Sequence, residues 1–160
     1  MSQALLVLSL WLHSLATVVL IGYFVCLSLV YLPYLSKLFS GVALGAALDE
    51  VSQRVRPWLG SSLLVFLISG AYLTFGDANY LGLGGFGNSW SVLMLVKHLL
   101  VLAMVGLWIL LGMTLRGGLT VAAKDPRARF EPLWRVRLII HGTSVCGALV
   151  LLLTVVAQVL

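Results

Sequence analysis

Residues 4–33 read ALLVLSLWLHSLATVVLIGYFVCLSLVYLP, an almost unbroken apolar run in which His13 is the only basic side chain. A helix needs about 20 apolar residues to cross a bilayer, so this run is long enough to span one. It has neither a basic segment before it nor a small-residue cleavage site at the distance typical of a signal peptide. We therefore expect a spanning helix that is retained in the protein.

The whole composition agrees with this first segment. The chain has 160 residues, of which 61% are hydrophobic and 9% charged, and its mean hydropathy is +1.11. These values exclude a soluble globular domain and predict an integral membrane protein, with residues 1–160 forming a single domain. Cys26 and Cys146 lie in apolar runs without a CxxC pattern, so we expect free thiols rather than a zinc site.

Three further apolar runs follow, and they complete a predicted set of four spans. We place these spans at residues 58–75, 90–115 and 133–160, after the first at 4–33. Residues 35–57 mix apolar and charged side chains, which predicts either an amphipathic helix at the membrane surface or an extension of the first span, ending in both cases at Pro57. The predicted fold is an all-α, integral membrane four-helix bundle.

The basic residues predict how the bundle is oriented. Lys and Arg cluster in the connections between spans one and two and between spans three and four, whereas both termini and the glycine-rich loop 76–89 have none. Under the positive-inside rule the termini then lie on the outer, periplasmic side of an inner (cytoplasmic) membrane. Because the net charge of +5 lies in these connections, we expect the lipid bilayer as a partner and no nucleic acid.

His13 and His98 are the first candidate site residues. Each lies eight to ten residues into a span, and spans one and three run in the same direction, so both imidazoles should lie roughly 12–15 Å below the same surface. Two histidines at one depth can bind a haem iron from opposite faces. The alternative for His13 is a hydrogen bond to a serine or a carbonyl group on a neighbouring helix.

Met94 and Lys97 lie close to His98 in sequence and extend the candidate site. Met94 is four residues before His98 on the same helical face, so with His13 it could form a soft copper site; ordinary core packing is the alternative. The Lys97 side chain leans toward the outer surface, where its ammonium could contact a haem propionate or a lipid phosphate.

His141 enters the membrane from the opposite side and is the third histidine of the chain. It could be an alternative iron ligand, a proton-handling group or a structural histidine, and we favour the structural role. No Ser-His-Asp, paired-carboxylate or nucleotide-binding pattern is present, and every Asp and Glu lies outside the predicted spans. The sequence therefore identifies no catalytic residue and leaves open whether the protein is an enzyme.

Several short motifs resemble those of a known family. They are WLH at 11–13, Gly22 and Pro33 in the first span, Ser69-Gly70 in the second, Lys97 before an apolar run in the third, and Arg137 to Gly147 at the start of the fourth. This set resembles the membrane domain of the copper-resistance protein D (CopD) family, which is similar to the HemJ-type protoporphyrinogen oxidases. The resemblance covers most of the chain.

The resemblance implies a four-helix membrane domain that handles copper in one branch and binds haem b for porphyrinogen oxidation in the other. It carries the family's first-helix histidine over to His13 and its third-helix lysine to Lys97. This sequence departs from the family by having His98 after the lysine, and His141 where the family more often has an acidic residue. Both departures add imidazoles and favour haem. The additional helices of full-length copper-resistance proteins are missing, so we do not expect copper import by this chain alone.

We therefore expect a b-type haem protein that uses His13 and His98 and transfers electrons from a membrane donor to a partner at the outer surface. A chain with so little extramembrane sequence would act as a subunit of a larger membrane complex. The alternatives are a copper homeostasis or transport protein that uses Met94, a porphyrinogen oxidase of the HemJ type, and a structural subunit without a cofactor.

Overall fold

The computed structural model describes residues 2–77, 79–82, 87–124 and 133–157, and within them the chain is helical apart from short connections and forms no strand. Four helical rods in this part are long and apolar enough to cross a membrane. The first, Gln3–Leu38, consists of α1 (Gln3–Cys26), the π-helical segment η1 (Leu27–Tyr31) and α2 (Leu32–Leu38). The others are α3 (Gly41–Phe75), α4 (Ser89–Lys124) and α5 (Leu133–Ala157). The protein is thus an all-helical, multi-pass membrane protein.

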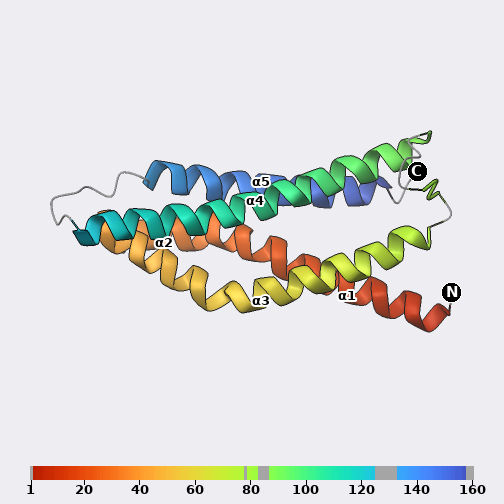
Figure 1. Cartoon of the computed structure of the whole chain (residues 1–160), viewed down its shortest axis with the longest axis horizontal. Coiled ribbons are helices and arrows are strands. Elements are labelled where there is room, and N and C mark those ends of the chain that lie inside the picture. Colours follow the sequence, from red (N-terminus) through yellow and green to blue (C-terminus); the bar gives the residue numbers. More distant parts are fainter. Residues whose placement is uncertain (1, 78, 83–86, 125–132, 158–160) are drawn as a thin grey trace.

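The four rods run up and down, so the start of α1 and the end of α5 lie at the same end of the bundle (Figure 1). α1 packs against α3 and α5, and α4 packs against the same two helices. α1 and α4 therefore lie diagonally across the bundle, and they point in the same direction. This arrangement places the two histidine-bearing helices on either side of the bundle axis.

Helix α3 differs from the sequence-based expectation at Pro57. Residues 41–57 of the predicted amphipathic connection continue without a break into the second span, so the expected helix end at Pro57 is wrong. Proline has no N–H to donate and its ring crowds the carbonyl of the residue four positions earlier, and α3 is visibly bent in its middle (Figure 1). The helix continues through the bend, because only the hydrogen bond at Pro57 itself is lost.

The first rod also continues past its expected end at Pro33. The chain widens into η1, where the Leu32 N–H donates to the Leu27 carbonyl five residues earlier, and α2 then continues to Leu38. Pro33 directly follows this widened turn, in which the backbone already departs from regular α-helical hydrogen bonding. The next turn contains Gly41, whose φ of +55° suits glycine.

The tightly packed core lies toward the end of the bundle opposite the termini. The side chains exposed by 2% or less there come from all four rods: Leu27, Leu44, Leu48, Leu111, Leu115, Val136 and Ile140. Most of the large exposed apolar side chains, such as Val18, Leu102 and Leu152, lie on spanning helices, where lipid would cover them. The half of the bundle near the termini has fewer fully buried side chains, and it contains a cavity of about 440 Å³.

Candidate functional site

His13 joins α1 to α3. Its Nδ1 lies 3.1 Å from the Ser69 hydroxyl and 3.2 Å from the Phe66 carbonyl oxygen. The imidazole also stacks on the Phe66 ring, with 4.4 Å between centroids and 25° between planes. These are the serine and carbonyl partners expected of a histidine that bonds across helices, and they fix the plane of the ring.

The same contacts determine which nitrogen of His13 carries the proton. The Ser69 hydroxyl donates its only hydrogen to the Val65 carbonyl oxygen at 2.6 Å, so toward His13 it acts as an acceptor. The Phe66 carbonyl is an acceptor as well. These contacts favour the tautomer in which Nδ1 of His13 donates, and that tautomer leaves the lone pair of Nε2 free. This is the tautomer that a metal-binding histidine uses when its other nitrogen is held in place.

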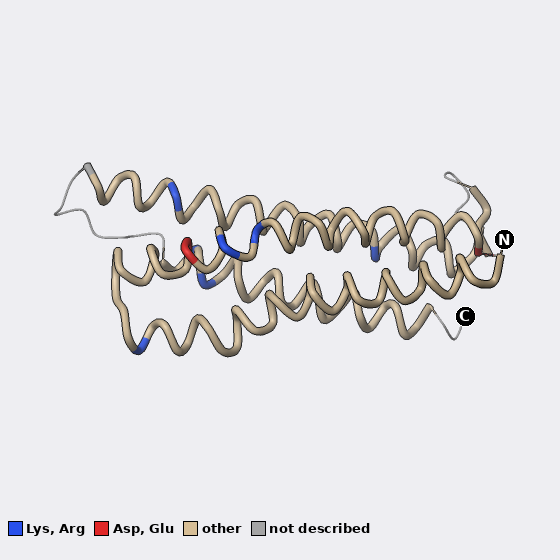
Figure 2. The backbone as a smooth tube through the Cα atoms, turned by 90° about the horizontal axis from the view of Figure 1, so that it is seen from below, with Lys and Arg blue, Asp and Glu red and all other residues tan. Residues whose placement is uncertain are grey.

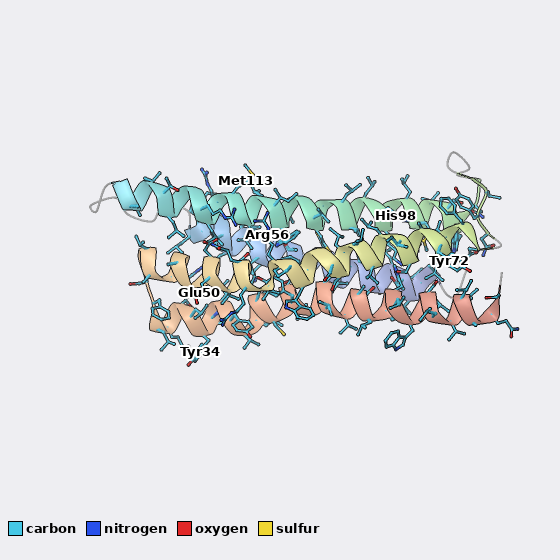
Figure 3. All side chains as sticks on the ribbon, turned by 60° about the horizontal axis from the view of Figure 1, so that its bottom comes forward. Tyr34, Glu50, Arg56, Tyr72, His98 and Met113 are labelled. Carbon is cyan, nitrogen blue, oxygen red and sulfur yellow. The ribbon has the colours of Figure 1, made fainter. Side chains whose placement is uncertain are left out.

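His98 has the same arrangement within its own helix. Its Nδ1 lies 2.6 Å from the Met94 carbonyl oxygen, which can only accept, so Nδ1 carries the proton and Nε2 is free. The side chain is exposed at the surface of the isolated chain, in the half of the bundle near the termini (Figure 3). Both sequence-predicted histidines therefore present a basic Nε2.

A single cavity of about 440 Å³ brings the two histidines together. It opens between α1, α3, α4 and the end of α5, and its volume is in the range of cofactor pockets. Met94 and Lys97, which the sequence placed near His98, also line it. The lining residues that sequence reasoning did not assign to the site include Phe66, Gly70, Thr74, Asp77, Trp90 and Thr154.

Trp90 shows why some of these were missed. Its position at the start of α4 is typical of an aromatic belt, and Trp11, Trp58 and Trp134 are indeed more than half exposed. Trp90 is only 7% exposed and lines the cavity instead. The position of a residue along a helix does not show which way its side chain points, so the sequence alone could not distinguish it from the others.

His141 lies elsewhere. Its Nδ1 is hydrogen-bonded to the Ser28 hydroxyl at 2.6 Å, and the neighbouring Ser144 hydroxyl donates to the Phe24 carbonyl at 2.7 Å. Ser28 follows His13 by 15 residues along the first rod, which is about 20 Å at helical rise. His141 is therefore too far away to share one ligand with His13, and its hydrogen bond joins η1 to α5.

The other metal-binding side chains add little to this picture. In the described residues, no three His, Cys, Asp or Glu side chains come together as they would in a conventional metal site. Cys26 and Cys146 are free thiols. The functional groups that line the cavity are thus two imidazoles, one thioether, one ammonium group, the Asp77 carboxylate and two threonine hydroxyls, in a mainly apolar wall.

No protein-family model matches this sequence, and no curated protein or solved structure is significantly similar to it.

Proposed function

We propose that this chain is a multi-pass b-type haem protein of the inner membrane that transfers electrons as a subunit of a larger membrane complex. The observation that carries the proposal is that His13 and His98 line one cavity with Nδ1 of each ring held by a main-chain carbonyl. Both rings keep Nε2 available as a ligand. The helices that bear them are diagonal and parallel, and both rings line the one cavity.

Different residues of the chain would have different roles at this site. His13 and His98 would bind the iron, while Phe66 and Ser69 hold the His13 ring in place. Lys97, in the cavity wall, would neutralise a propionate. Apolar side chains of α1, α3 and α4 would exclude water from the porphyrin: Leu10, Leu67, Leu73 and Val101. Bound in this way, haem b would supply a one-electron redox centre.

We also propose that the termini and the cavity face the outer side. The described Lys and Arg residues lie mainly in the half of the bundle away from the termini (Figure 2), whereas Lys97 lines the histidine cavity. The positive-inside rule then assigns the basic half to the inner side. In this orientation the haem would lie near an electron carrier at the outer surface.

The test is a dithionite-reduced minus air-oxidised spectrum, with a pyridine haemochrome assay, on protein purified from its native membrane. We expect a b-type α-band and about one haem per chain. His13→Ala and His98→Ala should each lose most of the haem, because one axial ligand is removed. His141→Ala, which removes an imidazole outside the cavity, should retain it.

Other results would redirect the assignment. A featureless spectrum from the unmodified protein would refute haem binding, provided that the protein and its variants are folded and monomeric. Copper binding or a structural role would then be the remaining proposals. Haem together with turnover of a porphyrinogen would favour the oxidase alternative.

A second candidate, Cu(I) binding, is favoured by one further observation. Met94 lines the same cavity as His13 and His98, so a thioether and two imidazoles are available to a soft metal. Met94→Leu conserves the side-chain volume and removes the sulfur. If copper is the ligand, this variant should weaken anaerobic Cu(I) binding by about tenfold or more in a bicinchoninate competition, since one ligand is lost. If haem is the ligand, the haem content of the Met94→Leu variant should equal that of the unmodified protein.

A further inference from the structure

A second, polar cavity lies between α3 and α4, away from the histidine cavity. Its volume is about 140 Å³, far more than the roughly 15 Å³ that one water molecule requires. Arg56 of α3 and Met113 of α4 lie at this level (Figure 3). The residues that line it are Asp49, Ser52, Gln53 and Arg56 from α3 with Trp108, Ile109, Gly112, Met113 and Arg116 from α4.

The two arginines lie where both helices leave the apolar part of the bundle. Arg56 comes two residues before the apolar run 58–75, and Arg116 directly follows the apolar run 90–115. Both side chains are exposed at the surface of the isolated chain. Because the hydrocarbon core ends where such runs end, the two guanidinium groups lie at the level of lipid headgroups.

The charges of the cavity favour an anion. Two guanidinium groups line it against one carboxylate, that of Asp49. Asp49 is only 8% exposed, and its Oδ2 accepts a hydrogen bond of 2.5 Å from the Gln53 amide one helical turn away. The negative charge is therefore partly engaged within α3, and the cavity keeps a net positive charge.

We propose that this cavity binds a phosphate group between Arg56 and Arg116. A guanidinium group offers a planar pair of N–H donors that matches phosphate oxygens, and two of them on different helices can grip one phosphate from two sides. The depth of the arginines favours the headgroup of an anionic phospholipid as the source. Binding would connect α3 to α4 at the end where the core is tightly packed, independently of any cofactor in the histidine cavity.

The experiment follows the thermal unfolding midpoint of the full chain, purified in a mild non-ionic detergent. Dihexanoyl-phosphatidylglycerol is compared with dihexanoyl-phosphatidylcholine, and sodium phosphate with sodium chloride at equal ionic strength. A ligand that binds only the folded protein raises the midpoint in a concentration-dependent way. We expect the anionic lipid to raise it and the zwitterionic lipid to have a much smaller effect.

Arginine variants test whether the lipid binds in this cavity. Arg56→Gln and Arg116→Gln should each weaken the fitted affinity about 10- to 100-fold, the range for losing a hydrogen bond to a charged group. Arg54→Gln is the matched control. It removes the same charge from the same helix, but Arg54 lines a neighbouring shallow groove instead of this cavity. If Arg54→Gln weakened binding equally, the lipid would be attracted by diffuse charge and the discrete site would be refuted.

Asp49→Asn gives a test of opposite sign, which does not depend on a loss of function. It removes the one negative charge of the cavity while keeping an oxygen to accept from Gln53, so anion affinity should rise. A fall in affinity would overturn the proposal. If sodium phosphate raised the unfolding midpoint and the anionic lipid did not, the phosphate site would be supported and its ligand would be a soluble phosphate. The absence of any shift with either phosphate source would also overturn it.

Discussion

Gly70 allows His13 to approach α3. A Cβ atom at Gly70 would lie 3.0 Å from Cε1 of His13, tighter than nearly all real Cβ contacts, so the ring would have to shift slightly. The ring cannot simply turn away, since it is stacked on Phe66 and bonded to Ser69. The Ser69-Gly70 pair thus contributes one residue that orients the imidazole and one that makes room for it.

We predict that Gly70→Ala lowers stability by about 1–3 kcal/mol, the usual cost of overpacking, and lowers the haem content because the His13 ring is displaced. Thermal unfolding and the pyridine haemochrome assay measure the two effects. Gly60→Ala is the control on the same helix, because nothing lies within 4 Å of its added Cβ. That variant should be neutral or slightly stabilising, as alanine favours helix over glycine. Equal behaviour of the two variants would contradict the proposed contact.

At the scale of single residues, spacing along two parallel helices led us to expect His13 and His98 at one depth, and both line the same cavity. The spacing could not identify Phe66 and Ser69 as partners of His13, or Ser28 as the partner of His141, because such pairs depend on how helices are rotated about their axes. That rotation is set by packing between helices, and the sequence around each residue does not reveal it.

Among the elements, η1 has the most unusual geometry. Its hydrogen bond runs over five residues, so this turn holds about one residue more than an α-helical turn. The Phe24 carbonyl, just before η1, accepts the Ser144 hydroxyl of α5, and Ser28 within it contacts His141. The wider turn thereby supplies polar contacts between the first rod and α5.

We predict that deleting Leu29, which is 69% exposed, is tolerated. Removing one residue should convert η1 to regular α-helix while the residues on either side keep their faces, at a cost of about 1 kcal/mol for the polar contacts that are lost. Deletion of Val18, 68% exposed but in regular α-helix, should prevent folding because it rotates the preceding part of α1 by about 100°. Expression level, monodispersity and thermal unfolding compare the two. Equal tolerance of both deletions would argue against this account.

The sequence predicted the helices well and their ends poorly. Hydropathy locates apolar runs, so four spanning helices were expected and are present. It gives no weight to polar helical turns beyond the apolar run, so α3 and α4 are longer than expected. Pro57 was expected to terminate a helix, but α3 bends there and continues to Phe75.

For the whole molecule, the proposed orientation makes a prediction about accessibility. In a background with Cys26→Ala and Cys146→Ala, a membrane-impermeant maleimide should label Asn79→Cys in intact cells and should not label Lys37→Cys. Asn79 lies in the loop near the termini, and Lys37 lies at the opposite end of the bundle; both are exposed. Labelling of both after permeabilisation controls for reactivity. The reversed pattern would place the histidine cavity on the inner side.

Because α1 begins and α5 ends at the same end of the bundle, the chain returns to the side from which it starts (Figure 1). A gene duplication that joined two copies head to tail would therefore need only a short linker and no extra spanning helix. Both copies would insert in the same orientation, with their histidine cavities opening to one compartment. A tandem protein built in this way would hold two such sites side by side at one depth, rather than one near each surface of the membrane.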